Sequence, residues 1–283
     1  MNHDHRSLFT WLWLSLWLSL WAACVTPLPA IQDGPIKVAA CQILVDGDPE
    51  AALARVDAAL GEAVALGAQI ACFPEACVLG WVNPEAHTRA GGPNGATVKR
   101  LQELARRHRI MFAVGLVQKE GESLHNVALL IDRDGEVLLR HRKVNIMQGL
   151  MEPAYVAGDE EAASVVDTRL GRIGLLVCAD TFKDTLVNTL AQARPDLVLV
   201  PYGWAAPEGD WPGHGKSLHA WISNTALKTG APVLGVDSVG ALGHGPWTGF
   251  VLGGQSACAG SSGELHGVLA DREAQVPVFP DGK

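Results

Sequence analysis

The regular alternation of short apolar runs with amphipathic segments, between residues 36 and 270, constrains the fold more than any other feature. Residues 68–73 form an apolar run that suits a buried strand, whereas residues 48–67 open on Asp48-Pro49 and repeat apolar side chains at helical spacing. This pattern predicts a layered α/β fold. With 283 residues, 48% of them hydrophobic, the chain is long enough to bury a substantial core. We therefore expect one α/β domain.

A hairpin signal adds antiparallel pairing to this fold. The segment Asp132-Arg133-Asp134-Gly135 separates two apolar runs and is typical of a tight turn between strands, so a mixed sheet is expected. We expect strands at residues 36–44, 68–73, 110–117, 126–131, 137–142, 164–166, 173–177, 197–200, 233–236 and 250–252, with a last hairpin turn at 260–263. We expect helices at residues 48–67, 97–108, 183–193 and 216–228.

The first thirty residues differ from the rest of the chain and are typical of a secretory leader. Arg6 precedes an apolar run at 8–23, which is shorter than the roughly 20 residues of a membrane-spanning helix. Residues 20–24, which end on Cys24, resemble a lipoprotein box, although Trp21 fits it poorly. We expect an exported protein, periplasmic or membrane-anchored through a lipid on Cys24 or an uncleaved leader. Ordinary cleavage nearby is an alternative, and a wrongly assigned start codon would leave the protein in the cytoplasm.

Charge and cysteine content narrow the classes of partner. The net charge of −8 includes no basic run, so nucleic acid is not an expected partner. No phosphate-binding glycine loop follows a strand, no Cys-x-x-Cys pair occurs, and the histidines do not cluster at ligand spacing, so no cofactor and no metal are implied. Four further cysteines lie on or beside apolar strands and are interpreted as free thiols: Cys41, Cys72, Cys77 and Cys258.

Three strand ends carry side chains that suit acyl transfer. The strand at 68–73 breaks at Pro74 and presents Glu75, the strand at 137–142 leads to Lys143, and the strand at 173–177 ends at Cys178. Reactive groups gather at such ends because the backbone there is rigidly placed. A thiol attacks a carbonyl, a carboxylate takes its proton and an ammonium faces the forming oxyanion. A chain of this length offers many such combinations, so the residue types alone make only a candidate.

These stretches resemble the three signatures of the nitrilase (carbon-nitrogen hydrolase) superfamily. They are Phe73-Pro74-Glu75, Arg142-Lys143-Val144 and the sequence Leu-Leu-Val-Cys-Ala-Asp at 175–180. The resemblance implies a four-layer α-β-β-α sandwich with mixed sheets over residues 31–283, after a leader at 1–30. It implies that Glu75, Lys143 and Cys178 form the triad, that Glu152 is a second glutamate that orients water or the lysine, and that the protein is a dimer.

Departures from the family pattern limit the expected substrate. Ala179-Asp180 follow the cysteine where true nitrilases usually carry Trp-Glu, so amide or carbamoyl hydrolysis of a small molecule is favoured over nitrile hydrolysis. The arginine that clamps a substrate carboxylate in some amidase and carbamoylase branches is absent there. An acyltransferase with the same triad and a non-catalytic exported lipoprotein remain alternatives. Tyr202 and Trp204 are candidates for the pocket wall or for core packing.

Three histidines in the C-terminal half of the chain carry no expected role in catalysis or metal binding. His214, His219 and His244 lie in Gly-rich or polar surroundings and are interpreted as surface residues.

Overall fold

A computed structural model describes residues 35–162 and 164–280. The expected leader, with Cys24 and its proposed lipid, lies outside this part of the chain. Within the described residues, no helix is both long and apolar enough to cross a membrane.

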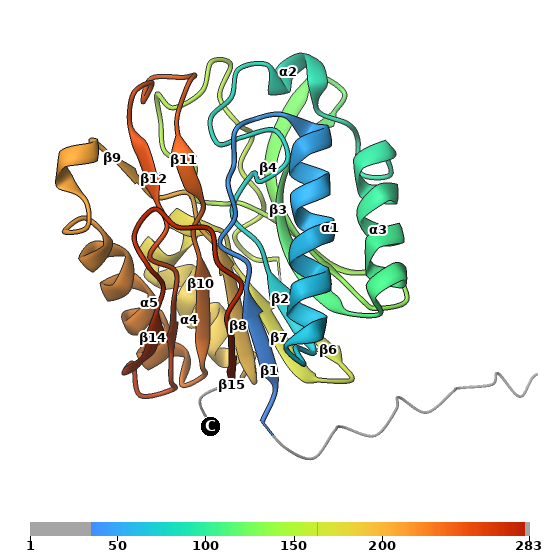
Figure 1. Ribbon diagram of the computed structural model, residues 1–283, viewed down its shortest axis with the longest axis vertical. Helices are drawn as coiled ribbons and strands as arrows, with labels where there is room; N and C mark the ends of the chain where they lie inside the picture. The colour runs from blue at the N-terminus through green and yellow to red at the C-terminus, as the bar shows by residue number, and fades with distance from the viewer. Residues whose placement is uncertain (1–34, 163, 281–283) are drawn as a thin grey trace, which may run out of the picture.

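Two six-stranded sheets form the centre of the molecule (Figure 1). The first has the order β15-β1-β2-β3-β4-β5 and the second the order β14-β13-β10-β8-β7-β6. Strands of the first sheet are β1 (Lys37–Ala40), β2 (Ile70–Cys72), β3 (Met111–Glu120), β4 (Ser123–Ile131), β5 (Val137–Arg142) and β15 (Val278–Pro280). Strands of the second are β6 (Val165–Thr168), β7 (Gly171–Leu175), β8 (Leu197–Pro201), β10 (Val233–Val236), β13 (Ala257–Ala259) and β14 (Leu265–Val268). Both sheets contain parallel and antiparallel pairs, as the hairpin signal predicts.

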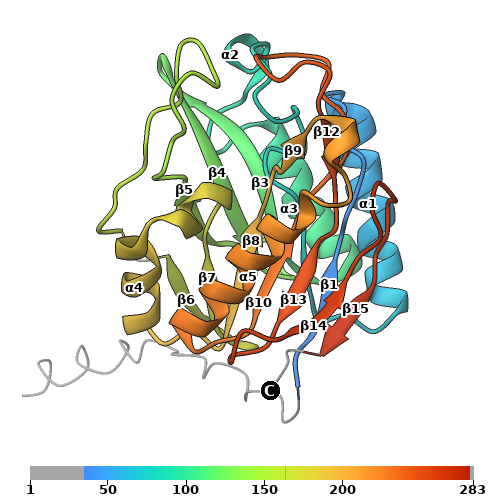
Figure 2. The ribbon, with the colours of Figure 1, turned by 90° about the vertical axis from the view of Figure 1, so that its left-hand side faces the viewer.

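Helices cover the outer faces of the two sheets, which gives the expected four-layer α-β-β-α sandwich (Figures 1 and 2). The first sheet packs against α1 (Pro49–Ala65) and α3 (Ala96–His108), and the second against α4 (Asp184–Gln192) and α5 (Gly215–Thr229). At one end lie α2 (Ala86–Arg89) and a small sheet of β9 (Ala205–Ala206), β11 (Val239–Ala241) and β12 (Val251–Gly253). Short 3-10 helices span Cys178–Phe182 and Glu208–Asp210.

Local chemistry explains why these segments take these forms. The carboxylate of Asp48 accepts the backbone N–H groups of Glu50 and Ala51 and so caps α1, with Pro49 at its first turn. Strand residues alternate between two apolar clusters: Val38 packs between the sheets, whereas Ala39 faces α1 and α3. One side of each strand therefore joins the two sheets and the other binds a helical layer.

The structure places one more strand beyond the regular sequence pattern, within the domain expected at residues 31–283. The sequence pattern stops near residue 270, but β15 pairs antiparallel with β1, so Val278 lies opposite Ala39. Two-residue and three-residue strands such as β9 and β11 are too short to produce a periodic apolar pattern, and the sequence did not predict them.

Candidate active site

Glu75 lies in a sharp turn that follows β2 and is completely buried. The next residue, Ala76, has a φ of 47°, in the left-handed region that residues with a side chain rarely adopt. The turn lies directly against β3, since the N–H of Gly115 donates to the carbonyl of Pro74 at 3.1 Å. A Cβ at Gly115 would come within 2.5 Å of the Cα of Glu75. Only glycine therefore lets the carboxylate segment approach the sheet this closely.

The ammonium of Lys143 meets this carboxylate from the end of β5. Lys143 Nζ lies 2.7 Å from Glu75 Oε1, and only 4% of Lys143 is exposed. The amide of Asn126, on β4, donates to the same oxygen at 2.6 Å. Among the described residues, the other oxygen, Glu75 Oε2, is buried without a hydrogen-bond partner. One oxygen of the carboxylate is thus saturated and the other is available to a proton.

Cys178 follows β7 at the entry to a 3-10 helix and has a φ of 46°. Strain of this kind persists only where the surroundings enforce it, and it concentrates at functional sites. The thiol is 3% exposed and points toward the carbonyl oxygen of Gly203, at 3.9 Å. The Cys178 sulfur therefore lies at the turn between β7 and the 3-10 helix, next to the backbone of the residues that follow.

Electrostatics join the three side chains. Burial raises the pKa of the Cys178 thiol, the charge of Glu75 raises it further, and the charge of Lys143 acts in the opposite direction. For Lys143, burial lowers the pKa, but nearby negative groups, of which the Glu75 carboxylate acts most strongly, outweigh it, and the net pKa is raised. The structure therefore holds a charged Lys143 beside a Cys178 thiol that is protonated at neutral pH.

Asp180 ties the lysine segment to the cysteine segment. Its Oδ1 accepts the backbone N–H groups of Val144 at 3.0 Å and Asn145 at 2.8 Å, directly after Lys143. Its Oδ2 accepts the backbone N–H of Val177 at 3.1 Å, directly before Cys178. Asp180 is fully buried, so this carboxylate fixes the separation of the lysine and cysteine segments.

A histidine completes the bonds of this carboxylate. Nε2 of His141 lies 2.7 Å from Asp180 Oδ2, and Nδ1 of His141 lies 2.7 Å from the hydroxyl of Ser164. Burial alone would raise the pKa of Asp180, but the hydrogen bond and charge of His141 outweigh it and lower the pKa. Asp180 is therefore a positioning residue, held as a carboxylate with four donors.

Replacing Asp180 with asparagine is expected to loosen the site. The NH₂ group of the asparagine would replace one carboxylate oxygen, so it would face either the donors of Val177 and His141 or the two backbone N–H groups that follow Lys143. Each donor left unpaired costs about 1–3 kcal/mol of unfolding free energy. Misplacement of the lysine is expected to lower kcat by about 10-fold to 100-fold, with a smaller change in KM. Urea denaturation and steady-state kinetics measure both, with the exposed Asp167→Asn as control.

The loss of stability in Asp180→Asn is expected to depend on pH, and the direction of this dependence follows from the pKa of Asp180. Because the folded state lowers the pKa of Asp180, its carboxylate stabilises the protein above about pH 4, the usual value for the unfolded chain. That contribution disappears as pH falls through the folded pKa. The stability difference between wild type and Asp180→Asn is thus expected to be full at pH 7 and to shrink below pH ~4. A difference that is constant across this range would contradict the role of the charge.

A small aromatic pocket opens onto the sulfur. Its volume is about 130 Å³. It is lined by Trp81, Met147, Cys178, Phe182, Gly203, Trp204, Ala205, His214 and Trp247. Trp204 therefore lines the pocket, whereas Tyr202 is fully buried behind it and donates to the hydroxyl of Thr181 at 3.2 Å. The surface assignment of His214 is wrong, since it is half-buried in the pocket wall.

The structure brings together three of the four residues that the sequence singles out. Glu75, Lys143 and Cys178 converge, but Glu152 is exposed, and no hydrogen bond recorded in the described part of the chain joins it to them. The resemblance implies that Glu152 lies beside the nucleophile, but the structure places its side chain in solvent. The same segment instead places Tyr155 inward, with a buried hydroxyl that has no hydrogen-bond partner among the described residues.

Sequence reasoning missed Asn126 and the role of Asp180. An asparagine inside the apolar strand β4 is the signal that was available for Asn126, because a buried amide there needs a polar partner.

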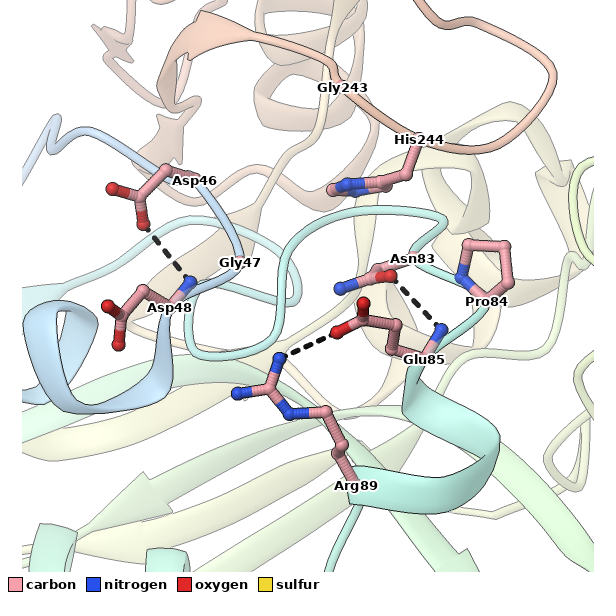
Figure 3. A pocket seen from close by; sticks show the side chains of 9 residues that line it. All are labelled: Asp46, Gly47, Asp48, Asn83, Pro84, Glu85, Arg89, Gly243 and His244. Atoms are coloured by element: carbon pink, nitrogen blue, oxygen red, sulfur yellow. Dashed lines mark hydrogen bonds and ion pairs between the residues drawn. The ribbon is translucent and has the colours of Figure 1, made fainter.

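A larger hollow of about 600 Å³ lies at the surface and contains none of the triad (Figure 3). It is lined by Asp46, Gly47, Asp48, Asn83, Pro84, Glu85, Arg89, Gly243 and His244. Its charged groups already have partners: Glu85 pairs with Arg89 at 2.7 Å, and Asp46 pairs with Arg55 at 2.6 Å and accepts the backbone N–H of Asp48 at 3.2 Å. We assign the chemistry to the smaller pocket, because only that one reaches a nucleophile. In the described residues, no group of three or more His, Cys, Asp or Glu side chains is arranged to hold a metal ion.

The sandwich and its buried glutamate, lysine and cysteine place the protein in the nitrilase superfamily. The model of the carbon-nitrogen hydrolase family matches residues 37–277, and the chain belongs to this family. A mutant of an amidase from Nesterenkonia sp. AN1, with acrylamide added at its active-site cysteine, has a similar structure. Its TM-score is 0.74 at 27% identity, and the match covers 86% of this chain and 92% of that one.

Curated relatives include enzymes for amides and for nitriles. The chloroplastic omega-amidase of Arabidopsis thaliana is 26% identical over 192 residues, which cover 62% of this chain and 51% of the relative. The bromoxynil-specific nitrilase of Klebsiella pneumoniae subsp. ozaenae is 27% identical over 197 residues, which cover 65% of this chain and 50% of the relative. The chain thus spans about half the length of the curated relatives it matches.

Proposed function

We propose that this protein hydrolyses an amide or carbamoyl carbon-nitrogen bond of a small molecule through a thioester on Cys178. The proposal depends on one observation: a protonated thiol, a carboxylate with one unpaired oxygen and a charged ammonium share a buried site. The similar amidase with an active-site cysteine supports it. Ala179-Asp180 after the cysteine favours an amide over a nitrile.

Acylation begins with a thiol that still carries its proton. Because the pKa of Cys178 is raised, the proton leaves during attack, and Glu75 Oε2 is the buried acceptor without another partner. The sulfur forms a bond to the carbonyl carbon, and the oxygen that becomes negative faces Lys143 and the backbone N–H of Ala179. Glu75 then gives the proton to the nitrogen, the carbon-nitrogen bond breaks, and ammonia or an amine leaves.

Deacylation uses the same carboxylate. Glu75 takes a proton from water, whose oxygen forms a bond to the acyl carbon. The sulfur-carbon bond then breaks, Glu75 returns the proton to the sulfur, and the acid is released. The ion pair of Glu75 with Lys143, at 2.7 Å, holds the carboxylate in position between these transfers.

A substrate panel tests this activity. We expect the full chain to release ammonia from small primary amides or carbamoyl compounds, with the matching acid as the other product, and more slowly from nitriles. A panel of ordinary primary amines, added as competing acceptors, separates the alternatives. A product that is mostly the new amide would indicate an acyltransferase, and a panel with neither ammonia nor an acyl adduct on Cys178 would contradict the proposal.

A further inference from the structure

The pocket beside Cys178 has a wall of aromatic rings. Trp81 and Trp247 meet edge to face with ring centroids 4.9 Å apart, and Phe182 and Trp204 meet in the same way at 5.8 Å. These rings come from four separate segments of the chain, and Met147 adds an apolar side chain at the exposed edge. Such a wall gives apolar contacts in several directions at once.

Contacts of Trp81 with His244 and with the backbone of Gly203 hold this aromatic wall in place. The imidazole of His244 lies 2.9 Å from the carbonyl oxygen of Trp81, on the side of the surface hollow shown in Figure 3. A Cβ at Gly203 would come within 2.7 Å of the Trp81 ring, so the ring rests directly on the backbone whose carbonyl faces the Cys178 thiol. The aromatic wall and the nucleophile are therefore parts of one packed unit, formed before substrate binds.

The lining carries no fixed charge. It contains no arginine, lysine, aspartate or glutamate. His214 is its one histidine, and burial lowers the pKa of that side chain against the opposing charge of Asp210, so it is neutral at neutral pH. The ammonium of Lys143 is already paired with Glu75. A charged group on the substrate would therefore lose its water without gaining a partner.

The size of the pocket is equally restrictive. Its volume of about 130 Å³ lies below the range of pockets for drug-sized ligands, which starts near 300 Å³. An acyl substituent of a few carbon atoms fills it.

We propose that the substrate is a short-chain amide whose acyl substituent is uncharged and apolar, held between Trp81, Trp204 and Trp247. This inference rests on the proposed hydrolysis at Cys178 and names the substrate class for it. Amides that carry a carboxylate or an ammonium at the far end of the chain are excluded by the same wall.

Three amides of equal chain length test the charge rule. Butyramide is neutral, succinamate ends in a carboxylate and 3-aminopropanamide ends in an ammonium. We expect kcat/KM for butyramide to exceed the other two by at least about 100-fold, because an unpaired charge loses its solvation in the pocket. Octanamide is expected to be a poorer substrate than butyramide. Equal or better use of either charged amide would overturn the proposal, and preference for 3-aminopropanamide would indicate a cation held by the rings.

A charge variant gives a matched control. Met147 is 39% exposed at the pocket edge, so Met147→Arg adds a cation there without burying it. We expect the ratio of succinamate to butyramide turnover to rise at least tenfold. Val156→Arg is the matched control, because Val156 is 44% exposed and lies outside the pocket lining. This variant is expected to leave the ratio unaltered.

Alkylation tests the pocket independently of hydrolysis. Iodoacetamide is neutral and iodoacetate is anionic, and mass spectrometry reports how fast each modifies Cys178. Relative to free cysteine, we expect at least a tenfold preference for iodoacetamide. If no amide is hydrolysed but this preference holds, the proposed activity fails and the uncharged pocket stands. If amides are hydrolysed and iodoacetate modifies Cys178 as fast as iodoacetamide does, the inference about the uncharged pocket fails and the proposed activity stands.

Discussion

Lys143→Met is expected to lower the unfolding free energy by about 3–5 kcal/mol, the usual loss when one partner of a buried ion pair is removed. The two groups lie 2.7 Å apart, with the lysine side chain 5% exposed and that of the glutamate fully buried. Removing the ammonium leaves the Glu75 carboxylate with one hydrogen bond from Asn126. The charge is then buried without an opposite charge beside it.

The double variant Glu75→Gln/Lys143→Met is expected to recover most of that loss, because both charges leave together. Urea denaturation measures the three free energies. Lys228→Met removes an exposed partner of Asp184 and is expected to cost about 1 kcal/mol or less. Both active-site variants are also expected to lose at least about 100-fold in kcat, since a base or an oxyanion donor is gone. A double variant no more stable than Lys143→Met would show that the pair is not the source of the loss.

The elements that the sequence predicts best are those with long periodic patterns. Helix α1 follows from Asp48-Pro49 and the apolar spacing after it, and the hairpin of β4 and β5 follows from the turn that ends at Gly135. Residues 278–280 carry no such pattern, because β15 owes its place to pairing with β1 across the whole chain. Long-range pairing of this kind leaves no local signal.

For the site, strand ends predicted which segments meet but not which side chains turn inward. Glu75, Lys143 and Cys178 follow directly from rigid strands, and the structure brings them together. Glu152 lies in a loop, where sequence position does not fix orientation, and its side chain faces solvent. His214 lies directly before α5, and its ring contacts Trp204 at 5.8 Å and Trp211 at 5.3 Å. Neither orientation follows from a periodic pattern in the sequence.

Cys178→Ala is expected to lower kcat for amide hydrolysis by at least about 10⁴-fold, because loss of a nucleophile removes the covalent route entirely. Wild-type protein quenched in acid during turnover is expected to carry an acyl group on Cys178, detected as a mass increase on that peptide. The alanine variant is expected to show none. Cys41→Ala removes another buried thiol, in the cluster beneath α1, and is expected to keep both the activity and the adduct. Activity of Cys178→Ala within tenfold of wild type would exclude the thioester route.

Stability separates this role from that of a structural cysteine. The φ of 46° at Cys178 is strained for any residue with a Cβ, whereas glycine adopts it freely. A cysteine kept for packing would lose stability when cut to glycine, because a buried side chain disappears. A cysteine kept for chemistry at a strained turn gains from the relief, so Cys178→Gly is expected to be at least as stable as Cys178→Ala while equally inactive. A glycine variant less stable than the alanine variant by more than about 1 kcal/mol would indicate that the strain is not stored at this residue.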